Sequence, residues 1–427
     1  MSSSVGSGKT VISKIAPDCE ENAKPACGPC EPLVDLCTMT ESNGTTASGF
    51  EGVREAFEAN FEKGLEIGAS FSAYHRGEKV VDLWGGTADV ATGRAWDEHT
   101  LALVFSTTKG ATAMCANKLA QEGALDVDAP VARYWPEFAA GGKENIPVAY
   151  LLSHQAGLAW IDGDMTLDQA LSWDPVVDAL AQQVPHYEPG SQHGYHATTY
   201  GWLVGEVIRR ISGRSVGTYF HDEIATPLGL DFWIGLPEAE EPRVAPLVGG
   251  LADPSVVEDP EVRAFVNEIM GPDTILGRAL FAPGRAFSDP DVWNARALHA
   301  AEIPAANGIG DARSLARMYA ACIGTVDGVR ILTDDQIRRA TTQLTSGPNT
   351  VLLDLDIQFG LGFMLHSSMI EIGGARSFGH FGAGGSFGWA DPEADLAFGY
   401  VMNRMDMGLA GDVRGFELIN ACYAAIR

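Results

Sequence analysis

One lysine of this 427-residue chain stands three residues after a serine, in the tetrapeptide Ser-Thr-Thr-Lys that runs from Ser106 to Lys109. An apolar run over residues 101–105 precedes it, and small residues follow, which predicts a helix from about Ser106 to Glu122. At the start of a helix, residues three apart share one face, so the serine hydroxyl and the lysine amine can meet. Because a hydroxyl is a weak nucleophile that needs a base, this spacing suggests nucleophilic catalysis by Ser106 with Lys109 as its base.

The proposed base requires an unusual lysine. Its pKa must fall from about 10.4 toward neutrality, and burial among apolar side chains or a second cation nearby would lower it. The start of the helix would also favour negative charge developing on Ser106. The competing interpretation is a helix-capping serine beside a solvated Lys109, and the pattern alone leaves both open.

A second candidate group lies on a loop rich in glycine and proline, residues 188–196, which precedes a helix predicted over Tyr200–Ile211. Loops on a rigid scaffold often hold catalytic groups, and this one carries Tyr195. A tyrosine near a lysine ammonium can lose part of its phenol pKa and share the proton transfer. The alternative is an aromatic side chain at the edge of the core.

A third candidate is the segment from Gly379 to Ser386, in which four of the eight residues are glycine. It lies in a strand predicted over Phe378–Trp389. Glycines weaken a strand unless another backbone or a ligand must come close. An edge strand here could offer a backbone N–H to an oxyanion.

In this order and at these separations, the three elements resemble those of the serine β-lactamase and penicillin-binding-protein superfamily. More narrowly, they are similar to the class C β-lactamase-related esterases, the family VIII carboxylesterases. The resemblance runs from Phe50 to the C-terminus and includes the stretches Leu151–Leu158, Asn307–Asp311 and Phe359–Gly362. It implies an α+β fold, with an antiparallel sheet flanked by helices and a mostly helical second subdomain, as the order of the predicted elements also suggests.

The resemblance implies a role for each catalytic candidate. Ser106 matches the acylated nucleophile, Lys109 its base partner, and Tyr195 the tyrosine of the family's Y-x-N element. The implied reaction is hydrolysis of carboxylic esters, with lactones as a further option, through an acyl-enzyme.

The resemblance also implies an oxyanion and substrate-binding group made of Ser106, His380, Phe381, Gly382 and Ala383. His380-Phe381-Gly382 stands where lactamases have K-T-G, and esterase relatives often carry H-x-G there. The family's oxyanion hole uses the N–H of the nucleophile and one just after this motif, here Ala383.

Two departures from the lactamase pattern favour esters. Position 197 is alanine where lactamases have asparagine, so the amide that helps to hold a β-lactam is absent. A neutral imidazole at His380 would attract a carboxylate less than a lysine ammonium does. A β-lactamase, D-amino-acid peptidase or small-amide hydrolase with the same residues is the alternative, and a catalytically silent scaffold is an alternative of another class.

Two other serines match the G-x-S-x-G pattern of α/β-hydrolases, Ser386 and Ser215. That motif requires a strand before the serine, a helix after it, and an acid and a histidine later in the chain. A turn and another strand follow Ser386, and no histidine lies beyond His380. Ser215 follows a predicted helix end, so neither serine is expected to be the nucleophile.

Aromatic residues around the Pro- and acid-rich stretch 236–304 are expected to wall the substrate pocket, unless they are ordinary core residues. They are Trp233, Phe265, Phe281, Phe287 and Trp293.

Residues 1–48 read as a polar arm, and residues 49–427 as one hydrolase domain. Its α/β part is predicted over about 49–110 and 305–427, and its helical subdomain over about 111–304. The arm carries Cys19, Cys27, Cys30 and Cys37. Because prolines flank the C-x-x-C pair and the spacing is irregular, exposed thiols on a flexible tail are favoured over a redox pair or a zinc site.

The net charge of −27 argues against a nucleic-acid or anionic-membrane partner, since both need clustered cations. The partner we expect is a small-molecule ester or lactone, without cofactor or metal, because His154, His193 and His196 lack ligand spacing. Without an apolar stretch near the start, the expected location is the cytoplasm. The sequence leaves a homo-oligomer open.

Overall fold

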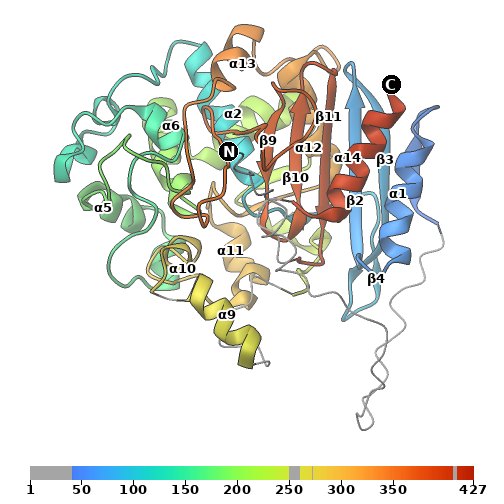
Figure 1. Cartoon of the computed structure of the whole chain (residues 1–427), viewed down its shortest axis with the longest axis horizontal. Coiled ribbons are helices and arrows are strands. Elements are labelled where there is room, and N and C mark those ends of the chain that lie inside the picture. The colour runs from blue at the N-terminus through green and yellow to red at the C-terminus, as the bar shows by residue number, and fades with distance from the viewer. Residues whose placement is uncertain (1–40, 250–259, 272, 407–410) are drawn as a thin grey trace, which may run out of the picture. The chain divides into compact units, whose positions relative to one another are not determined.

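The computed structural model describes residues 41–249, 260–271, 273–406 and 411–427, apart from the side chains of residues 261, 262 and 265. An antiparallel sheet with helices along both faces lies beside a mostly helical region, which confirms the predicted α+β fold class (Figure 1). The strands are β1 Asn43–Thr46, β2 Gly68–His75, β3 Glu78–Asp89, β4 Arg94–Ala95, β5 Ala102–Leu103, β6 Phe232–Ile234, β7 Gly308–Gly310, β8 Met364–Leu365, β9 Phe378–Phe381, β10 Phe387–Asp391 and β11 Leu396–Met402. The helices are α1 Glu51–Glu62, α2 Thr108–Gln121, α3 Val148–Leu152, α4 Leu167–Leu171, α5 Asp174–Gln182, α6 Thr199–Ser212, α7 Val216–Phe220, α8 Thr226–Leu228, α9 Pro260–Met270, α10 Ile275–Leu280, α11 Arg296–Ala300, α12 Ala312–Ile323, α13 Asp334–Ala340 and α14 Val413–Ala425.

The main sheet has the strand order β1-β3-β2-β11-β10-β9-β8, with β4 paired to β3. The long strand predicted over Phe378–Trp389 is wrong, because the chain forms two strands there, β9 and β10, that pair with each other. Gly384 and Gly385, with φ of +83° and +121°, form the reversal between them, a conformation that side-chain-bearing residues rarely adopt. The glycines that weaken a strand therefore end it and create a loop.

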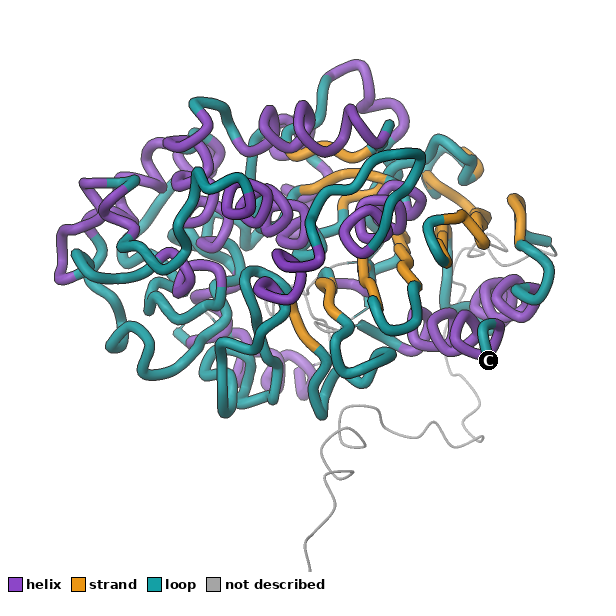
Figure 2. The backbone as a smooth tube through the Cα atoms, turned by 90° about the horizontal axis from the view of Figure 1, so that it is seen from above, coloured by secondary structure: helices purple, strands orange, loops and turns teal. Residues whose placement is uncertain are grey.

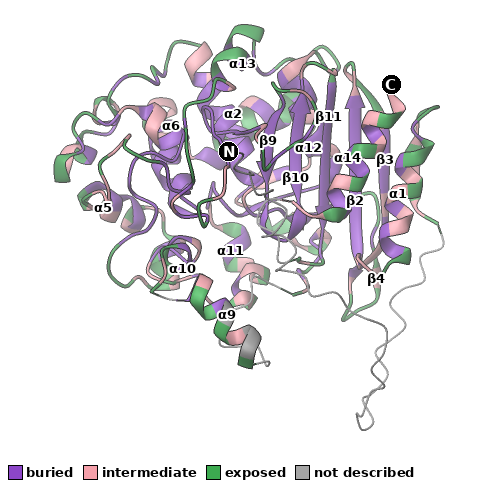
Figure 3. Ribbon diagram, viewed as in Figure 1, coloured by how far each residue is buried: buried purple, intermediate pink, exposed green. Residues whose placement is uncertain are grey.

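Helices cover both faces of the sheet. α12 packs closely on one face, where a Cβ on Gly399 would lie 2.5 Å from the Cβ of Leu315. α1 and α14 lie side by side on the other face, and their inner residues join Phe71 and Phe398 in a second core cluster. The central strands β2, β11, β10 and β9 are consequently buried almost throughout, whereas the outer sides of α1 and α14 are exposed (Figure 3).

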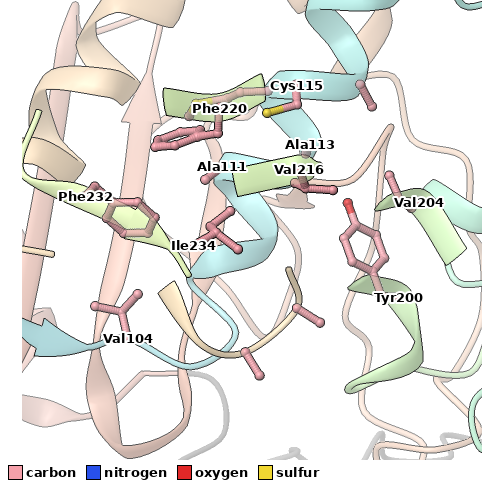
Figure 4. Packing of buried hydrophobic residues seen from close by; sticks show 14 of the residues in the cluster. Val104, Ala111, Ala113, Cys115, Tyr200, Val204, Val216, Phe220, Phe232 and Ile234 are labelled. Atoms are coloured by element: carbon pink, nitrogen blue, oxygen red, sulfur yellow. The ribbon is translucent and has the colours of Figure 1, made fainter. Parts of the chain in front are cut away.

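The helical region lies beside the sheet, as the view from above shows (Figure 2). Its central element is α2, in which nearly every residue is buried. Small side chains such as Ala111, Ala113 and Cys115 let α7, α6 and the short sheet β5-β7-β6 approach α2 closely (Figure 4). This packing fixes the start of α2, where the candidate nucleophile and its base lie.

The predicted arm lies mostly outside the described residues, as do its four cysteines. Its last part includes β1, which pairs with β3 at the edge of the sheet. The division into arm, α/β part and helical subdomain stays a prediction. None of the helices in the described ranges combines the length and the apolarity that a bilayer crossing requires.

Candidate active site

Ser106 lies in a tight turn between β5 and α2. The helix begins at Thr108, so the serine stands just before it and not in its first turn as predicted. The preceding residue, Phe105, has a φ of +43°, a conformation that costs a non-glycine residue about 1–3 kcal/mol. Thr108 Oγ1 holds the Phe105 carbonyl at 2.5 Å, and the Lys109 N–H donates to the Ser106 carbonyl at 3.0 Å. The turn leaves Ser106 half-buried among fully buried neighbours.

The Lys109 side chain is fully buried and lies beside the serine. Its Nζ is 2.9 Å from Ser106 Oγ, 2.6 Å from the Ala197 carbonyl oxygen and 2.9 Å from that of Ala305. Burial holds the pKa of Lys109 well below its usual range. The expected second cation is not the cause, since desolvation alone accounts for the shift.

This set of partners suits a neutral amine. Neutral Lys109 can donate its two N–H bonds to the carbonyls of Ala197 and Ala305, which only accept. Its lone pair then faces the Ser106 hydroxyl, which can donate to it. The geometry thus fits a base poised to take the Ser106 proton.

Tyr195 completes the group, because its phenol lies beside Ser106, which acts to lower the phenol pKa. Lys109 Nζ lies 4.8 Å above the Tyr195 ring. The expectation of a lowered phenol pKa is wrong: burial raises the pKa of Tyr195 and outweighs the lowering effect of Ser106. The phenol therefore keeps its proton, which suits a proton donor rather than a standing base.

Three consecutive backbone N–H groups hold the Tyr195 loop, two of them through His154. The Gly194 N–H donates to the His154 carbonyl at 3.0 Å, and the His196 N–H donates to His154 Nδ1 at 3.1 Å. The Tyr195 N–H donates to Asn349 Oδ1 at 3.1 Å. Neither role is predicted from the sequence. His154 stands in one of the stretches that support the resemblance, but nothing in the sequence marks Asn349.

His380 lies on β9 and is fully buried. Its Nδ1 donates to the Phe381 carbonyl at 2.7 Å, which leaves Nε2 as an acceptor. Burial, and next the charge of Lys109, lower the pKa of His380 to about 3. The site therefore offers a neutral imidazole where the lactamase pattern has a cation.

The predicted oxyanion donors are brought together. Ser106 and Ala383 line the same cavity, and neither N–H donates a hydrogen bond to another described residue. A Cβ on Gly382 would lie 2.1 Å from the Val104 carbonyl oxygen, so only glycine fits beside the nucleophile turn. Phe381 differs from the others, because its ring packs against three aromatic side chains of the core behind the sheet, those of Phe387, Trp389 and Phe416.

The cavity in front of Ser106 is mainly apolar. None of the described residues that line it is charged, and three of the expected aromatic walls are among them. Trp233 is wrong as a wall, since it lies at another hollow, under Arg243. Phe265 lies outside the described side chains. The lining residues are Phe105, Ser106, Ala197, Thr198, Leu247, Gly249, Leu280, Phe281, Phe287, Ser288, Pro290, Trp293, Ala306, Ala383 and Met405.

The two rival serines have other bonding partners. Ser386 is buried and its hydroxyl donates to the Val104 carbonyl at 2.8 Å. Ser215 caps α7 and donates to Glu302 at 2.6 Å. In the described part of the chain, no three His, Cys, Asp or Glu side chains gather closely enough to hold a metal ion.

Comparisons with known proteins agree with this site. The family model described as Beta-lactamase matches residues 57–418. The esterase/beta-lactamase LipL of Mycobacterium tuberculosis is 36% identical over 396 residues, covering 90% of this chain and 89% of LipL. The crystal structure of a family VIII carboxylesterase matches with a TM-score of 0.80 and 39% identity, covering 90% of this chain and all of that one. A penicillin-binding protein homologue from Caulobacter crescentus matches with the same TM-score, identity and coverage.

The matched range contains the nucleophile turn, the Tyr195 loop and the glycine-rich loop after β9, so family model and geometry concern the same part of the chain. The chain belongs to the beta-lactamase family.

Proposed function

We propose that this protein is a serine hydrolase that cleaves uncharged carboxylic esters, lactones among them, through an acyl-enzyme on Ser106. One observation carries the proposal. At an apolar cavity, the Ser106 hydroxyl lies 2.9 Å from a buried lysine whose other partners are two carbonyls, and the Tyr195 phenol lies beside it. The predicted enzyme class, a carboxylesterase-type hydrolase, is confirmed by the match to LipL and to the family VIII carboxylesterase.

Acylation uses the three groups in sequence. As Ser106 Oγ bonds to the ester carbon, its proton passes to neutral Lys109. The carbonyl electron pair moves to the oxygen, which accepts from the N–H groups of Ser106 and Ala383. When the intermediate collapses, the ester C–O bond breaks and the leaving alkoxide takes the proton of the Tyr195 hydroxyl. The Lys109 ammonium then gives a proton back to Tyr195.

Deacylation repeats these steps with water. The water gives its proton to Lys109 as its oxygen bonds to the acyl carbon, and the bond to Ser106 Oγ breaks. Ser106 recovers its proton, and the carboxylic acid leaves. No step needs a cofactor or metal, because the serine, the lysine and the tyrosine supply nucleophile, base and acid.

The site favours esters over β-lactams for two reasons. Ala197 offers a methyl group where an amide would bind the β-lactam, and His380 is neutral, so a substrate carboxylate gains no ion pair. The second candidate is a β-lactamase, D-amino-acid peptidase or small-amide hydrolase with the same residues. It is kept because the name of LipL includes β-lactamase as well as esterase.

The test compares the wild type with Ser106→Ala on a short-chain p-nitrophenyl ester, a lactone and a chromogenic cephalosporin. We expect ester turnover by the wild type and none by the variant. Turnover of the cephalosporin alone would favour the second candidate. No turnover of any substrate would favour a catalytically silent scaffold, and full activity of Ser106→Ala would overturn the proposed nucleophile.

We also propose that the protein is located in the cytoplasm.

A further inference from the structure

The G-x-S-x-G segment around Ser386 has no part in the chemistry proposed above, yet Ser386 belongs to the loop that carries one proposed oxyanion donor and contacts the turn that carries the other. Ser386 ends the loop that joins β9 to β10 and is 1% exposed. The same loop begins with Gly382 and Ala383, and Ala383 carries one of the donors. The other donor, the N–H of Ser106, belongs to the turn before α2.

The Ser386 hydroxyl joins these two segments. It lies 2.8 Å from the Val104 carbonyl oxygen and 3.1 Å from Thr107 Oγ1. Because a carbonyl only accepts, the Ser386 proton is directed to Val104, and the Thr107 hydroxyl donates to Ser386. Val104 and Thr107 flank Ser106 in the chain, so one buried hydroxyl holds the turn on both sides of the nucleophile.

Backbone hydrogen bonds within the loop fix the position of Ala383 relative to that of Ser386. The Gly382 N–H donates to the Ser386 carbonyl at 2.7 Å, and the Gly385 N–H donates to the Gly382 carbonyl at 3.2 Å. These bonds close the loop into a small ring next to Ala383. A Cβ on Gly382 would lie 2.3 Å from Ser386 Oγ, so the two residues are already in close contact.

The far side of the loop is anchored separately. Arg414 Nη2 donates to the Gly384 carbonyl at 2.6 Å, and Arg414 is held by Glu66 at 3.2 Å and by Asp412. The loop is therefore fixed to the body of the protein by Arg414 and to the nucleophile turn by Ser386. Of these two anchors, the Ser386 hydroxyl is the one that directly couples the Ala383 loop to Ser106.

We propose that Ser386 is a positioning residue, which together with Thr107 sets the separation of the Ser106 and Ala383 N–H groups. This rests on the proposed function, in which those groups bind the ester oxyanion. Oxyanion donors act in the transition state, so a change in their separation lowers kcat more than it changes KM. The G-x-S-x-G motif around Ser386 thus supports catalysis by Ser106, which belongs to the Ser106–Lys109 motif.

The experiment measures kcat and KM of Ser386→Ala with a p-nitrophenyl ester, and its affinity for a trifluoromethyl ketone that forms a tetrahedral adduct. We expect kcat to fall about tenfold, less than the roughly 10²–10³-fold loss when a donor is removed outright. KM stays near the wild-type value, and the ketone binds more weakly by a similar factor. Thr107→Val shifts both quantities in the same direction, whereas Thr107→Ser, which keeps the hydroxyl, restores them.

Ser72→Ala is the matched control. Ser72 is fully buried on β2, and its hydroxyl also donates to a backbone carbonyl, that of Val81, at 2.8 Å. Ser386→Ala loses two buried hydrogen bonds and Ser72→Ala loses one, so both melting temperatures fall, that of Ser386→Ala at least as far. Only Ser386→Ala is expected to lose kcat and ketone affinity, which separates a positioning role from a merely structural one.

Ser106→Ala, measured in parallel, distinguishes the two proposals. If Ser106→Ala is silent while Ser386→Ala keeps the kcat and ketone affinity of the wild type, the positioning role is overturned and the proposed function stands. If Ser106→Ala stays active while Ser386→Ala is silent, both are overturned, because Ser386 is then the nucleophile.

Discussion

Lys109 and Lys143 are both fully buried in the described structure, but their surroundings differ by one partner. Lys143 Nζ donates to three backbone carbonyls, those of Ala140, Ala181 and Gln183. Lys109 Nζ has two carbonyl partners, and the third is the Ser106 hydroxyl. An ammonium has three N–H donors, so three carbonyls match it fully.

The Ser106 hydroxyl, in place of a third carbonyl, determines which protonation state of Lys109 its partners can accommodate. Three carbonyls can only accept, so the Lys143 site favours the charged form, and burial lowers the pKa of Lys143 to about 8. Stronger desolvation holds the pKa of Lys109 well below the usual range, and the Ser106 hydroxyl, which can also donate, suits the neutral form that results. A buried lysine can act as a base only where one of its partners, here the Ser106 hydroxyl, has a proton to donate. The partners of Lys109 thus fit its proposed role as the base, and those of Lys143 make it a structural clamp on the end of α5.

The largest effect is expected from Lys109→Met. Without the base, kcat/KM for an ester falls by about 10³-fold or more. The free energy of unfolding falls by less than in Lys143→Met, because two buried carbonyls rather than three lose their donor and a buried basic group is removed. Ester kinetics and urea unfolding on one protein preparation measure both quantities. If Lys109→Met keeps a tenth or more of the wild-type kcat/KM, Lys109 is not the base.

The pH dependence of the rate sharpens the same contrast. Activity requires neutral Lys109, so kcat/KM rises with pH through the lowered pKa of Lys109 and then levels off. Burial lowers the pKa of His380 and that of His196 to about 3, so neither adds a limb between about pH 5 and 8. Burial raises the pKa of Tyr195, which keeps its loss of a proton outside that range.

A rate profile of the wild type and of His380→Gln between about pH 5 and 9 checks this assignment. Both proteins are expected to show the same rising limb. If the limb disappears in His380→Gln, the titrating group is the histidine and not the lysine.

The smallest effect on activity is expected from Lys143→Met. Three buried carbonyls lose their donors, so the free energy of unfolding falls by about 2–4 kcal/mol. In the folded fraction kcat stays within about twofold of the wild type, since Lys143 contacts no residue of the cavity. Urea unfolding and active-site titration separate the two quantities. A kcat loss as large as that of Lys109→Met would contradict the structural role.

Elements with local signals could be predicted from the sequence. The helix predicted over Tyr200–Ile211 is confirmed as α6, and the spacing of Ser106 and Lys109 predicts their contact, because both depend on residues a few positions apart. The strand predicted over Phe378–Trp389 was wrong where glycines allowed a sharp reversal. Apolar and aromatic residues suit a strand, but backbone geometry decided where it ends.

Contacts between distant segments could not be predicted. The Ala197 and Ala305 carbonyls determine the form of Lys109, yet a backbone carbonyl has no signature in the sequence. The link between Thr107 and Ser386 spans 279 positions and depends on the packing of the whole sheet. Lys143 gave no signal at all, because a buried structural lysine and a solvated one look alike in a sequence.

The central claim, that Ser106 and no other serine is acylated, is tested most directly by trapping the acyl-enzyme. The wild type and Ser106→Ala are treated with a fluorophosphonate, digested, and mapped by mass spectrometry. We predict one adduct, on the peptide that contains Ser106, and none in the variant. An adduct on Ser386 or Ser215, or one that survives in Ser106→Ala, would contradict the account.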